Sequence, residues 1–139
     1  MAEQHYEGGC HCGALRYEVD LDLDKGTLRC NCSLCRKARS WFAFAPAERF
    51  RMKSGEHDQI LYRWTPAGKP KPNLTYHICA TCGVRTHANG QGFKSGQQIV
   101  GVQVSTLEGT DPQTLARGIR YVDGLHDQFD RTPENTEAL

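Results

Sequence analysis

The sequence has no long hydrophobic run and almost no net charge. No apolar stretch is long enough to span a bilayer, and residues 1–7 lack the cationic head and apolar segment of a secretory signal. We therefore expect a cytoplasmic protein without a membrane partner. The formal net charge of +1, with 24% charged residues, gives no general attraction to nucleic acid or to anionic membranes, so any basic effect must be local.

Internal repeats and low-complexity segments are also absent from the sequence. A chain of 139 residues is long enough to bury a core and is of ordinary size for one domain. We expect a single domain over residues 1–139, in which residues 130–139 form a loose tail.

Cysteine, in contrast, is frequent and clustered. Every cysteine lies in a Cys-x-Cys or Cys-x-x-Cys spacing, and the seven positions are Cys10, Cys12, Cys30, Cys32, Cys35, Cys79 and Cys82. An odd number cannot pair completely into disulfides within one chain, and these spacings are typical of zinc ligands in a cytoplasmic protein. We therefore predict metal sites. The alternative for the three central thiols is a redox switch, which would need an unbound thiolate.

The spacing favours one division of the cysteines into two sites. Glycine follows both the early pair (Cys10 and Cys12) and the late pair (Cys79 and Cys82), so the two turns are candidates for one closed, structural four-thiolate zinc. Three thiols of one loop then remain, Cys30, Cys32 and Cys35, and three protein ligands with a fourth open position are typical of a catalytic zinc. Other divisions stay open at this point. Two zinc ions per chain are expected, of which the second could be absent or labile.

The predicted three-thiolate site favours sulfur chemistry. Three thiolates leave a divalent zinc near a net charge of −1, and its strongly donating ligands make it a poor activator of water. An incoming thiol is a better fourth ligand, because a coordinating thiol loses its proton outright. Nearby cations could offset the negative charge or hold the carboxylates of an acidic substrate, although each could equally be an ordinary solvated side chain. These cations are Arg29, Arg36, Lys37 and Arg39.

Histidines give a weaker signal. His11 lies between two predicted ligands and His77 just before the late pair, so both are interpreted as structural. His87 and His126 are candidates for the fourth ligand or for proton transfer, although a lone histidine usually satisfies a local hydrogen bond. No residue is assigned as catalytic.

Hydrophobic alternation and turn residues predict mostly strands. The expected strands lie on both sides of the early cysteine turn within residues 5–20, and at 27–29, 41–45, 50–53, 59–64, 84–87 and 98–104, while residues 73–78 approach the late cysteine pair. A short helix or turn is expected after Ser33, at 36–39, and a helix at 111–117 with Asp111 as its N-cap and Pro112 at its first helical position. Residues 65–72 are expected to form an exposed turn and residues 123–127 a polar turn.

The three cysteine motifs together resemble those of the glutathione-dependent formaldehyde-activating (GFA) enzyme family, whose domain is shared with centromere protein V. The motifs are residues 8–17 (GGCHCGALRY), 30–37 (CNCSLCRK) and 79–85 (CATCGVR). The resemblance implies a mainly β, Mss4-like zinc-knuckle fold built from antiparallel hairpins with one or two short helices. It also implies a structural zinc at the early and late pairs and a catalytic zinc at the central three cysteines.

The family's founding activity joins glutathione to formaldehyde to give S-hydroxymethylglutathione, and its members are classed as carbon-sulfur lyases. The chain departs from the family at Asn31, where histidine is frequent, and at residues 38–41, where a glycine-containing stretch is common. These departures bear on the substrate more than on the zinc.

Two functions are carried forward. The first is a zinc-dependent carbon-sulfur lyase that acts on a glutathione-like thiol and a small aldehyde, or on their adduct. The alternative is a non-catalytic zinc-binding scaffold for a protein or nucleic-acid partner, of which nucleic acid is disfavoured by the near-neutral charge. The sequence does not determine the substrate, the proton-transfer residue, the fourth ligand of the second zinc or the oligomeric state.

Overall fold

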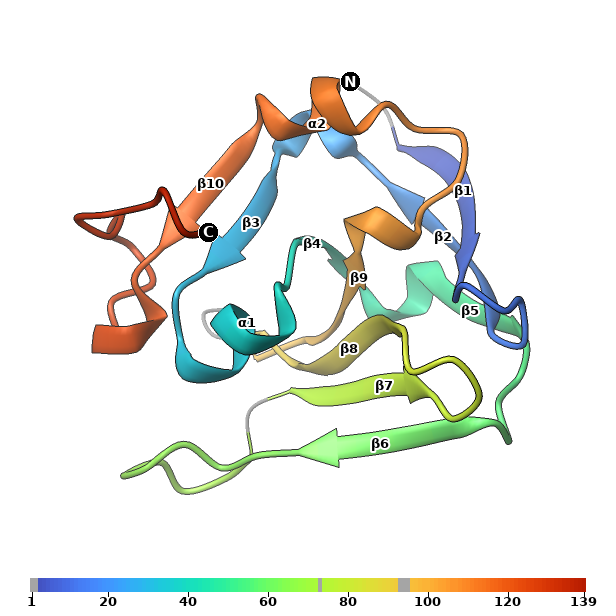
Figure 1. Cartoon of the computed structure of the whole chain (residues 1–139), viewed down its shortest axis with the longest axis horizontal. Helices are drawn as coiled ribbons and strands as arrows, with labels where there is room; N and C mark the ends of the chain where they lie inside the picture. Colours follow the sequence, from blue (N-terminus) through green and yellow to red (C-terminus); the bar gives the residue numbers. More distant parts are fainter. Residues whose placement is uncertain (1–2, 73, 93–95) are drawn as a thin grey trace.

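The computed structural model describes residues 3–72, 74–92 and 96–139, and these residues form two β-sheets (Figure 1). The smaller sheet has the order β1-β2-β5, with β1 at Gln4–Gly9, β2 at Arg16–Leu21 and β5 at Phe50–Ser54. The larger sheet has the order β10-β3-β4-β9-β8-β7-β6. Its strands are β3 (Thr27–Cys30), β4 (Phe42–Pro46), β6 (Gln59–Arg63), β7 (Thr75–Cys79), β8 (Arg85–Gln91), β9 (Gln98–Gln103) and β10 (Ile119–Val122).

Two short α-helices and four 3₁₀ turns complete the described part of the chain. Helix α1 is Ser33–Ala38 and helix α2 is Pro112–Ala116, and the 3₁₀ turns are η1 (Leu23–Lys25), η2 (Ala47–Arg49), η3 (Val104–Thr106) and η4 (Gly124–His126). The Asp111 side chain accepts a hydrogen bond from the Gln113 amide, which confirms the predicted N-cap of α2. No helix among the described residues is long and apolar enough to cross a membrane.

The main hydrophobic core lies between the two sheets. Strand β2 alternates as its sequence predicts, so that Tyr17, Val19 and Leu21 are buried against residues of β4 and β9. The Tyr17 hydroxyl lies 2.7 Å from the Thr106 hydroxyl, so the polar end of this buried ring has a partner. The core therefore fixes the small sheet against one face of the large sheet.

Strand β4 separates this core from a second cluster on the opposite face of the large sheet. Trp41, Ala43 and Ala45 pack into the main core, whereas Phe42 packs into the second cluster. That cluster contains all three cysteines of the central loop, together with Leu74, Tyr76, Ala88 and Val122. The central thiols, at the start of α1, are therefore in an apolar setting outside the main core.

The predicted mainly β fold of the Mss4-like kind, with its two short helices, is confirmed. Three local details differ from expectation. Helix α1 begins at Ser33 rather than at residue 36, because the Cys32 side chain caps it. Strands β3 and β10 pair in parallel, although every other strand pair between described residues is antiparallel. Strand β8 continues to Gln91, beyond the expected end at residue 87.

The C-terminal tail contains no described helix or strand after residue 130, yet it makes defined contacts. The carbonyl of Arg131 accepts a hydrogen bond from the Asp123 amide at 2.9 Å, and the carbonyl of Ala138 accepts one from Arg39 Nη1 at 2.6 Å. That this tail is loose stays a prediction.

Candidate metal centres

The structure brings the seven cysteines into two groups. Within each group the sulfur atoms all lie within 4.8 Å of one another; one group is Cys10, Cys12, Cys79 and Cys82 (the quartet) and the other is Cys30, Cys32 and Cys35 (the trio). These are the same two groups that the sequence spacing favoured. Each is a cluster that could bind a metal.

The quartet joins two turns that are distant in the sequence. Cys10 and Cys12 lie in the β1–β2 turn, and Cys79 and Cys82 lie at the β7–β8 turn. The Sγ atoms of Cys10 and Cys12 are 3.6 Å apart, and those of Cys12 and Cys79 are 3.7 Å apart. Zinc–sulfur bonds of about 2.3 Å in a tetrahedron place sulfurs about 3.8 Å apart, whereas a disulfide needs about 2.0 Å. The donor set and its spacing therefore fit zinc.

Backbone amides point at the sulfurs of both turns. Leu15 N–H donates to Cys10 Sγ at 3.3 Å, and the amides of Thr81 and Cys82 both donate to Cys79 Sγ at 3.4 Å. Such N–H···S hydrogen bonds stabilise the thiolate form that a metal requires. Gly13 and Gly83 take positive φ angles of 86° and 79°, which lets each turn close as predicted from their positions.

The trio is built by the end of β3 and the start of α1. Cys30 ends the strand, Cys32 is the N-cap of the helix and Cys35 lies in its first turn. The Cys32 amide donates to Cys30 Sγ at 3.4 Å and the Cys35 amide to Cys32 Sγ at 3.3 Å. Thiol hydrogen bonds from Cys30 and Cys35 lower the pKa of Cys32, and the same neighbours raise the pKa of Cys35. Among the three thiols, Cys32 is therefore the one whose thiolate form the neighbours favour.

Two residues of the large sheet that the sequence did not single out, Tyr76 and Arg85, face the trio. Tyr76 is buried in the same cluster, and burial together with the neighbouring thiols raises its pKa above the ordinary value of 10. The Arg85 guanidinium lies 4.5 Å from the centre of the Tyr76 ring and donates to Ser40 Oγ at 3.4 Å. Burial lowers the pKa of Arg85, while Cys35 and Cys32 favour its charged form. Arg85 is therefore a cation directed toward the trio.

The turn after β10 packs against the other side of the trio. A Cβ atom added to Gly124 would lie 2.3 Å from Cys30 Sγ, so only glycine lets the η4 backbone approach this closely. Asn31 ties the turn to the thiol loop, since its Nδ2 donates to Asp123 at 2.9 Å and its Oδ1 accepts from the Leu125 amide at 2.9 Å. The predicted polar turn at 123–127 is thus also a wall of the site. Only its tertiary position reveals this.

The two candidate histidines, His87 and His126, differ in their relation to the trio. His87 pairs with His77 across β7 and β8, and its buried ring stacks on His77 at 4.0 Å and lies 4.4 Å from Phe50. Its neighbour Ala88 faces the trio, so strand alternation directs His87 to the opposite face of the sheet. The hypothesis that His87 supplies the fourth ligand is therefore wrong.

His126 remains a candidate for proton transfer. It belongs to η4 and its Nδ1 lies 2.8 Å from the Asp123 carboxylate, which in turn holds Asn31. His77 is held by Gln59 at 2.7 Å and Asn89 at 2.9 Å, which fits the structural role predicted for it. His11 is exposed between two quartet cysteines and has no described hydrogen bond.

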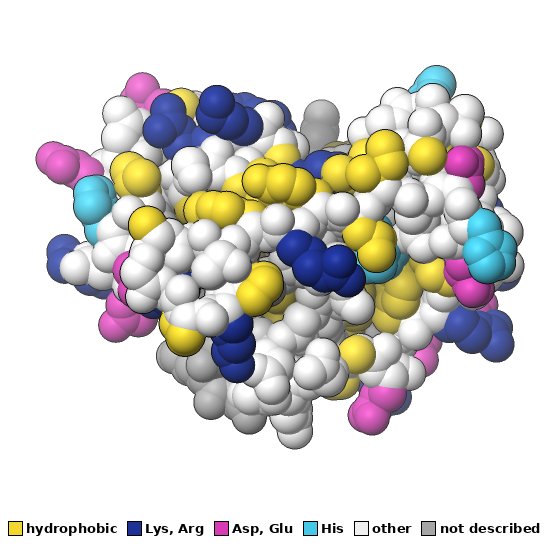
Figure 2. Space-filling view, turned by 90° about the horizontal axis from the view of Figure 1, so that it is seen from below, with side chains coloured by type: hydrophobic (Ala, Val, Ile, Leu, Met, Phe, Trp, Pro, Cys, Tyr) yellow, Lys and Arg dark blue, Asp and Glu magenta, His cyan; other side chains and the backbone are white. Residues whose placement is uncertain are grey.

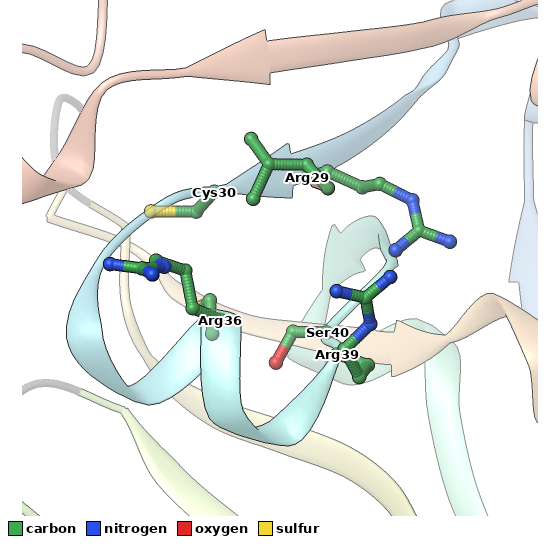
Figure 3. A pocket seen from close by; sticks show the side chains of 7 residues that line it. Arg29, Cys30, Arg36, Arg39 and Ser40 are labelled. Carbon is green, nitrogen blue, oxygen red and sulfur yellow. The ribbon is translucent and has the colours of Figure 1, made fainter. Parts of the chain in front are cut away.

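Three of the four predicted cations line one hollow beside the trio (Figure 3). Arg29, Arg36 and Arg39 line it together with Cys30, Cys35, Ser40 and Leu139. Figure 3 shows the ends of Arg29 and Arg39 directed toward one another and Arg36 beside the Cys30 sulfur. Lys37 is exposed and does not line this hollow.

Comparison with known proteins agrees with this geometry. Residues 5–120, which contain all seven cysteines, match the family model described as glutathione-dependent formaldehyde-activating enzyme. A protein of Halomonas elongata, whose name gives that activity as a provisional assignment, is 33% identical over 81 residues, covering 55% of this chain and 50% of the relative. The chain thus spans about half the length of this curated relative.

A solved structure is also similar. The crystal structure of a Rhodobacter sphaeroides protein superposes with a TM-score of 0.68 at 31% sequence identity, covering 84% of this chain and 99% of that one. The family match over most of the chain, joined to the two cysteine clusters, shows that the chain belongs to the glutathione-dependent formaldehyde-activating enzyme family.

Proposed function

We propose that this protein is a zinc-dependent carbon-sulfur lyase that acts on a glutathione-like thiol and a small aldehyde, or on their adduct, in the cytoplasm. In the forward direction the thiol sulfur attacks the carbonyl carbon, a carbon-sulfur bond forms, and the proton lost by the thiol ends on the carbonyl oxygen. The lyase direction is the reverse. No oxidant or reductant is needed.

The observation that carries this proposal is the trio of buried sulfurs without a fourth described cysteine or histidine beside them. A zinc ion there would supply an open coordination position at which a thiol is deprotonated at neutral pH. Catalytic zinc sites have this count of ligands, whereas structural sites are closed, as in the quartet. The two clusters thus suit two different roles in one small domain.

The chain's own residues would prepare the site for an anionic sulfur. Arg85 brings a positive charge toward the trio from the start of β8, and its contacts with Tyr76 and Ser40 hold the guanidinium in place. The apolar cluster around the trio reduces competing hydration, so each charge interaction is stronger than it would be in water. The η4 turn closes one side and leaves the arginine-lined side as the route for substrate.

The test is adduct formation above the spontaneous rate. Protein with two zinc ions per chain is mixed with glutathione and a panel of small aldehydes, and the hemithioacetal is followed by NMR or by consumption of the aldehyde. We expect acceleration with at least one pair, and its loss in a Cys35→Ser variant. If the doubly loaded protein accelerates no pair, the proposal is refuted.

The competing function, a zinc-binding scaffold for a protein partner, is favoured by one observation. Strand β6 forms an edge of the large sheet, and Ile60, Leu61 and Tyr62 on it are all about half exposed. Figure 2 shows hydrophobic side chains in a band on the side of the molecule that lies at the bottom of Figure 1, where β6 runs. A scaffold needs the quartet metal alone, so a trio that binds no zinc in the purified protein would favour this function.

A further inference from the structure

The hollow beside the trio collects positive charge that has no described counter-ion. Of the ion pairs between described side chains, none involves Arg29, Arg36 or Arg39. The described contact of the Arg29 guanidinium is the face of the Trp41 ring, whose centre lies 5.1 Å away. The ends of Arg29 and Arg39, which point toward one another (Figure 3), repel each other, and a bound anion would relieve that repulsion.

Arg39 occupies a backbone position that does not favour a side chain. It follows the last residue of α1 with φ 55° and ψ 45°, the left-handed conformation in which helices most often carry glycine. With φ 58°, Asp127 is the other described non-glycine residue with a positive φ, and it is held by Lys69 at 2.6 Å. The arginine at position 39 therefore keeps a guanidinium at the hollow in spite of the local backbone preference.

The described structure already places a hydrogen-bond acceptor in this hollow. Arg39 Nη1 donates to the Ala138 carbonyl at 2.6 Å, and Leu139 lines the space between the arginines and the trio. The cavity left there is about 10 Å³, which is only enough for one water molecule. Residues 136–139 lie beyond residues 5–120 that match the family, so this contact belongs to the chain's own C-terminal segment.

We propose that Arg29, Arg36 and Arg39 form a binding site for a carboxylate group of the thiol substrate, and that residues 136–139 cover this site and move aside when the substrate binds. Cys30 and Cys35 line the same hollow, so one small molecule can place a carboxylate on the arginines and its sulfur at the trio. The site therefore selects thiols that carry carboxylates over neutral or cationic thiols of similar size. This inference rests on the proposed function for the role of the thiol.

Binding of a thioether tests the carboxylate site separately from the proposed lyase activity. S-methylglutathione carries two carboxylates and no free thiol, so its affinity reports on the arginines without requiring catalysis. We expect S-methylglutathione to bind the zinc-loaded protein. Its dimethyl ester should bind at least about tenfold more weakly, because the ester cannot form charge-assisted hydrogen bonds through carboxylates. Calorimetry at low ionic strength measures both affinities. Added salt should weaken the binding of S-methylglutathione and leave the binding of its ester unchanged.

Charge variants locate the binding site. Arg29→Gln and Arg39→Gln should each weaken binding of S-methylglutathione by about tenfold and leave the affinity for its ester unchanged. Arg117→Gln is the matched control, since Arg117 is an exposed arginine at the end of α2 and does not line the hollow. Equal affinities for acid and ester, or an Arg117 variant as weak as the Arg39 variant, would overturn the proposal.

A shortened chain tests the cover. A variant that ends at Asn135 removes the Ala138 carbonyl and the Leu139 side chain from the hollow, while Pro133, which is buried, is kept. It should bind S-methylglutathione several-fold more tightly than the full chain, with an unchanged affinity of the ester. An affinity for the acid that is unchanged or lower would refute the covering role. Retained binding of S-methylglutathione in a protein that accelerates no aldehyde addition would refute the lyase and leave the carboxylate site standing.

Discussion

Cys32 combines two tasks in one side chain, because it belongs to the trio and also caps α1. Its sulfur accepts a hydrogen bond from the Cys35 amide, a contact that a serine hydroxyl at a helix N-cap also makes. A change of one ligand atom can therefore remove metal binding without removing the helix.

Cys32→Ser is accordingly expected to keep the fold and to retain one zinc ion per chain. The circular dichroism spectrum should be unchanged, and metal analysis should fall from two zinc ions to one. Cys79→Ser is the contrasting variant: Cys79 is buried and joins the two turns of the quartet, so its loss should lower thermal stability markedly. A Cys32 variant that unfolds would contradict the separation of the two sites.

Arg39→Gly should stabilise the fold while it weakens binding of the carboxylate ligand. Glycine removes the left-handed strain at the end of α1, which costs a residue with a side chain about 1 kcal/mol. Urea unfolding of the zinc-loaded protein measures the gain, and the S-methylglutathione titration measures the loss. A gain in stability together with a loss of affinity would show that Arg39 serves binding and not stability. A loss of both stability and affinity would contradict the prediction.

At the scale of elements, η4 shows how a short turn can shape a site formed by other segments. Its backbone lies against Cys30, and Asn31 ties it to the thiol loop from the other side. We therefore expect the turn to act on the position of the sulfurs.

Gly124→Ala is expected to weaken zinc binding at the trio by at least about tenfold, because its new Cβ would push Cys30 Sγ out of position. The quartet should keep its zinc. Gly118→Ala is a suitable control, since a Cβ there meets no atom closer than 3.7 Å. A competitive zinc indicator measures the zinc affinities of the trio and of the quartet. Equal zinc affinities of the trio in the two variants would show that η4 does not shape the trio.

Strand β8 carries a buried histidine whose charge state links stability to pH. Burial, with a smaller effect of His77, lowers the pKa of His87 from 6.5 to about 3. The unfolded chain therefore binds a proton between these values that the folded chain does not bind, so stability falls as the pH falls below about 6.5.

His87→Phe should flatten this dependence. From pH 7 to pH 5 the parent protein should lose about 2 kcal/mol more unfolding free energy than the variant. The difference between the two proteins is the quantity to measure by urea unfolding, because proton-driven loss of zinc affects both alike. Parallel pH curves would contradict the neutral, buried state of His87.

At the scale of the whole molecule, the quartet and the trio make different demands on the chain. The quartet fastens the β1–β2 turn to the β7–β8 turn, and so closes a long loop, whereas the trio lies within residues 30–35. Loss of a crosslink across a long loop releases more chain entropy in the unfolded state than loss of a local one. The quartet metal should therefore matter more for stability.

Stepwise chelation should remove the two metals in a fixed order. We expect the trio to lose zinc first with an unchanged far-ultraviolet spectrum, and the quartet to lose it last together with cooperative unfolding. A zinc-sensitive dye and circular dichroism, recorded on the same sample, follow both events. Simultaneous loss of both metals with the fold intact would show that the quartet is not a structural fastening.

Much of the fold could be predicted from the sequence because its signals are local. The alternation of Tyr17 and Val19 identified a strand with one buried face, and Asp111 with Pro112 identified the start of α2. The start of α1 was missed because its N-cap is a cysteine, a residue that usual capping preferences do not include. The parallel pairing of β3 and β10 was missed because the two strands are distant in the sequence.

By itself, the sequence favoured the division of the cysteines into these two clusters and indicated the family, because ligand spacing and turn glycines are short-range features. Only the tertiary structure decided what surrounds the trio. Strand alternation turned His87 away from it, the register shift between β7 and β8 left Arg85 on its side of the sheet, and the chain's path placed Gly124 and the C-terminal segment beside residues about 90 to 110 positions earlier. Such contacts depend on sheet register and packing between distant segments, which no local pattern of residues encodes.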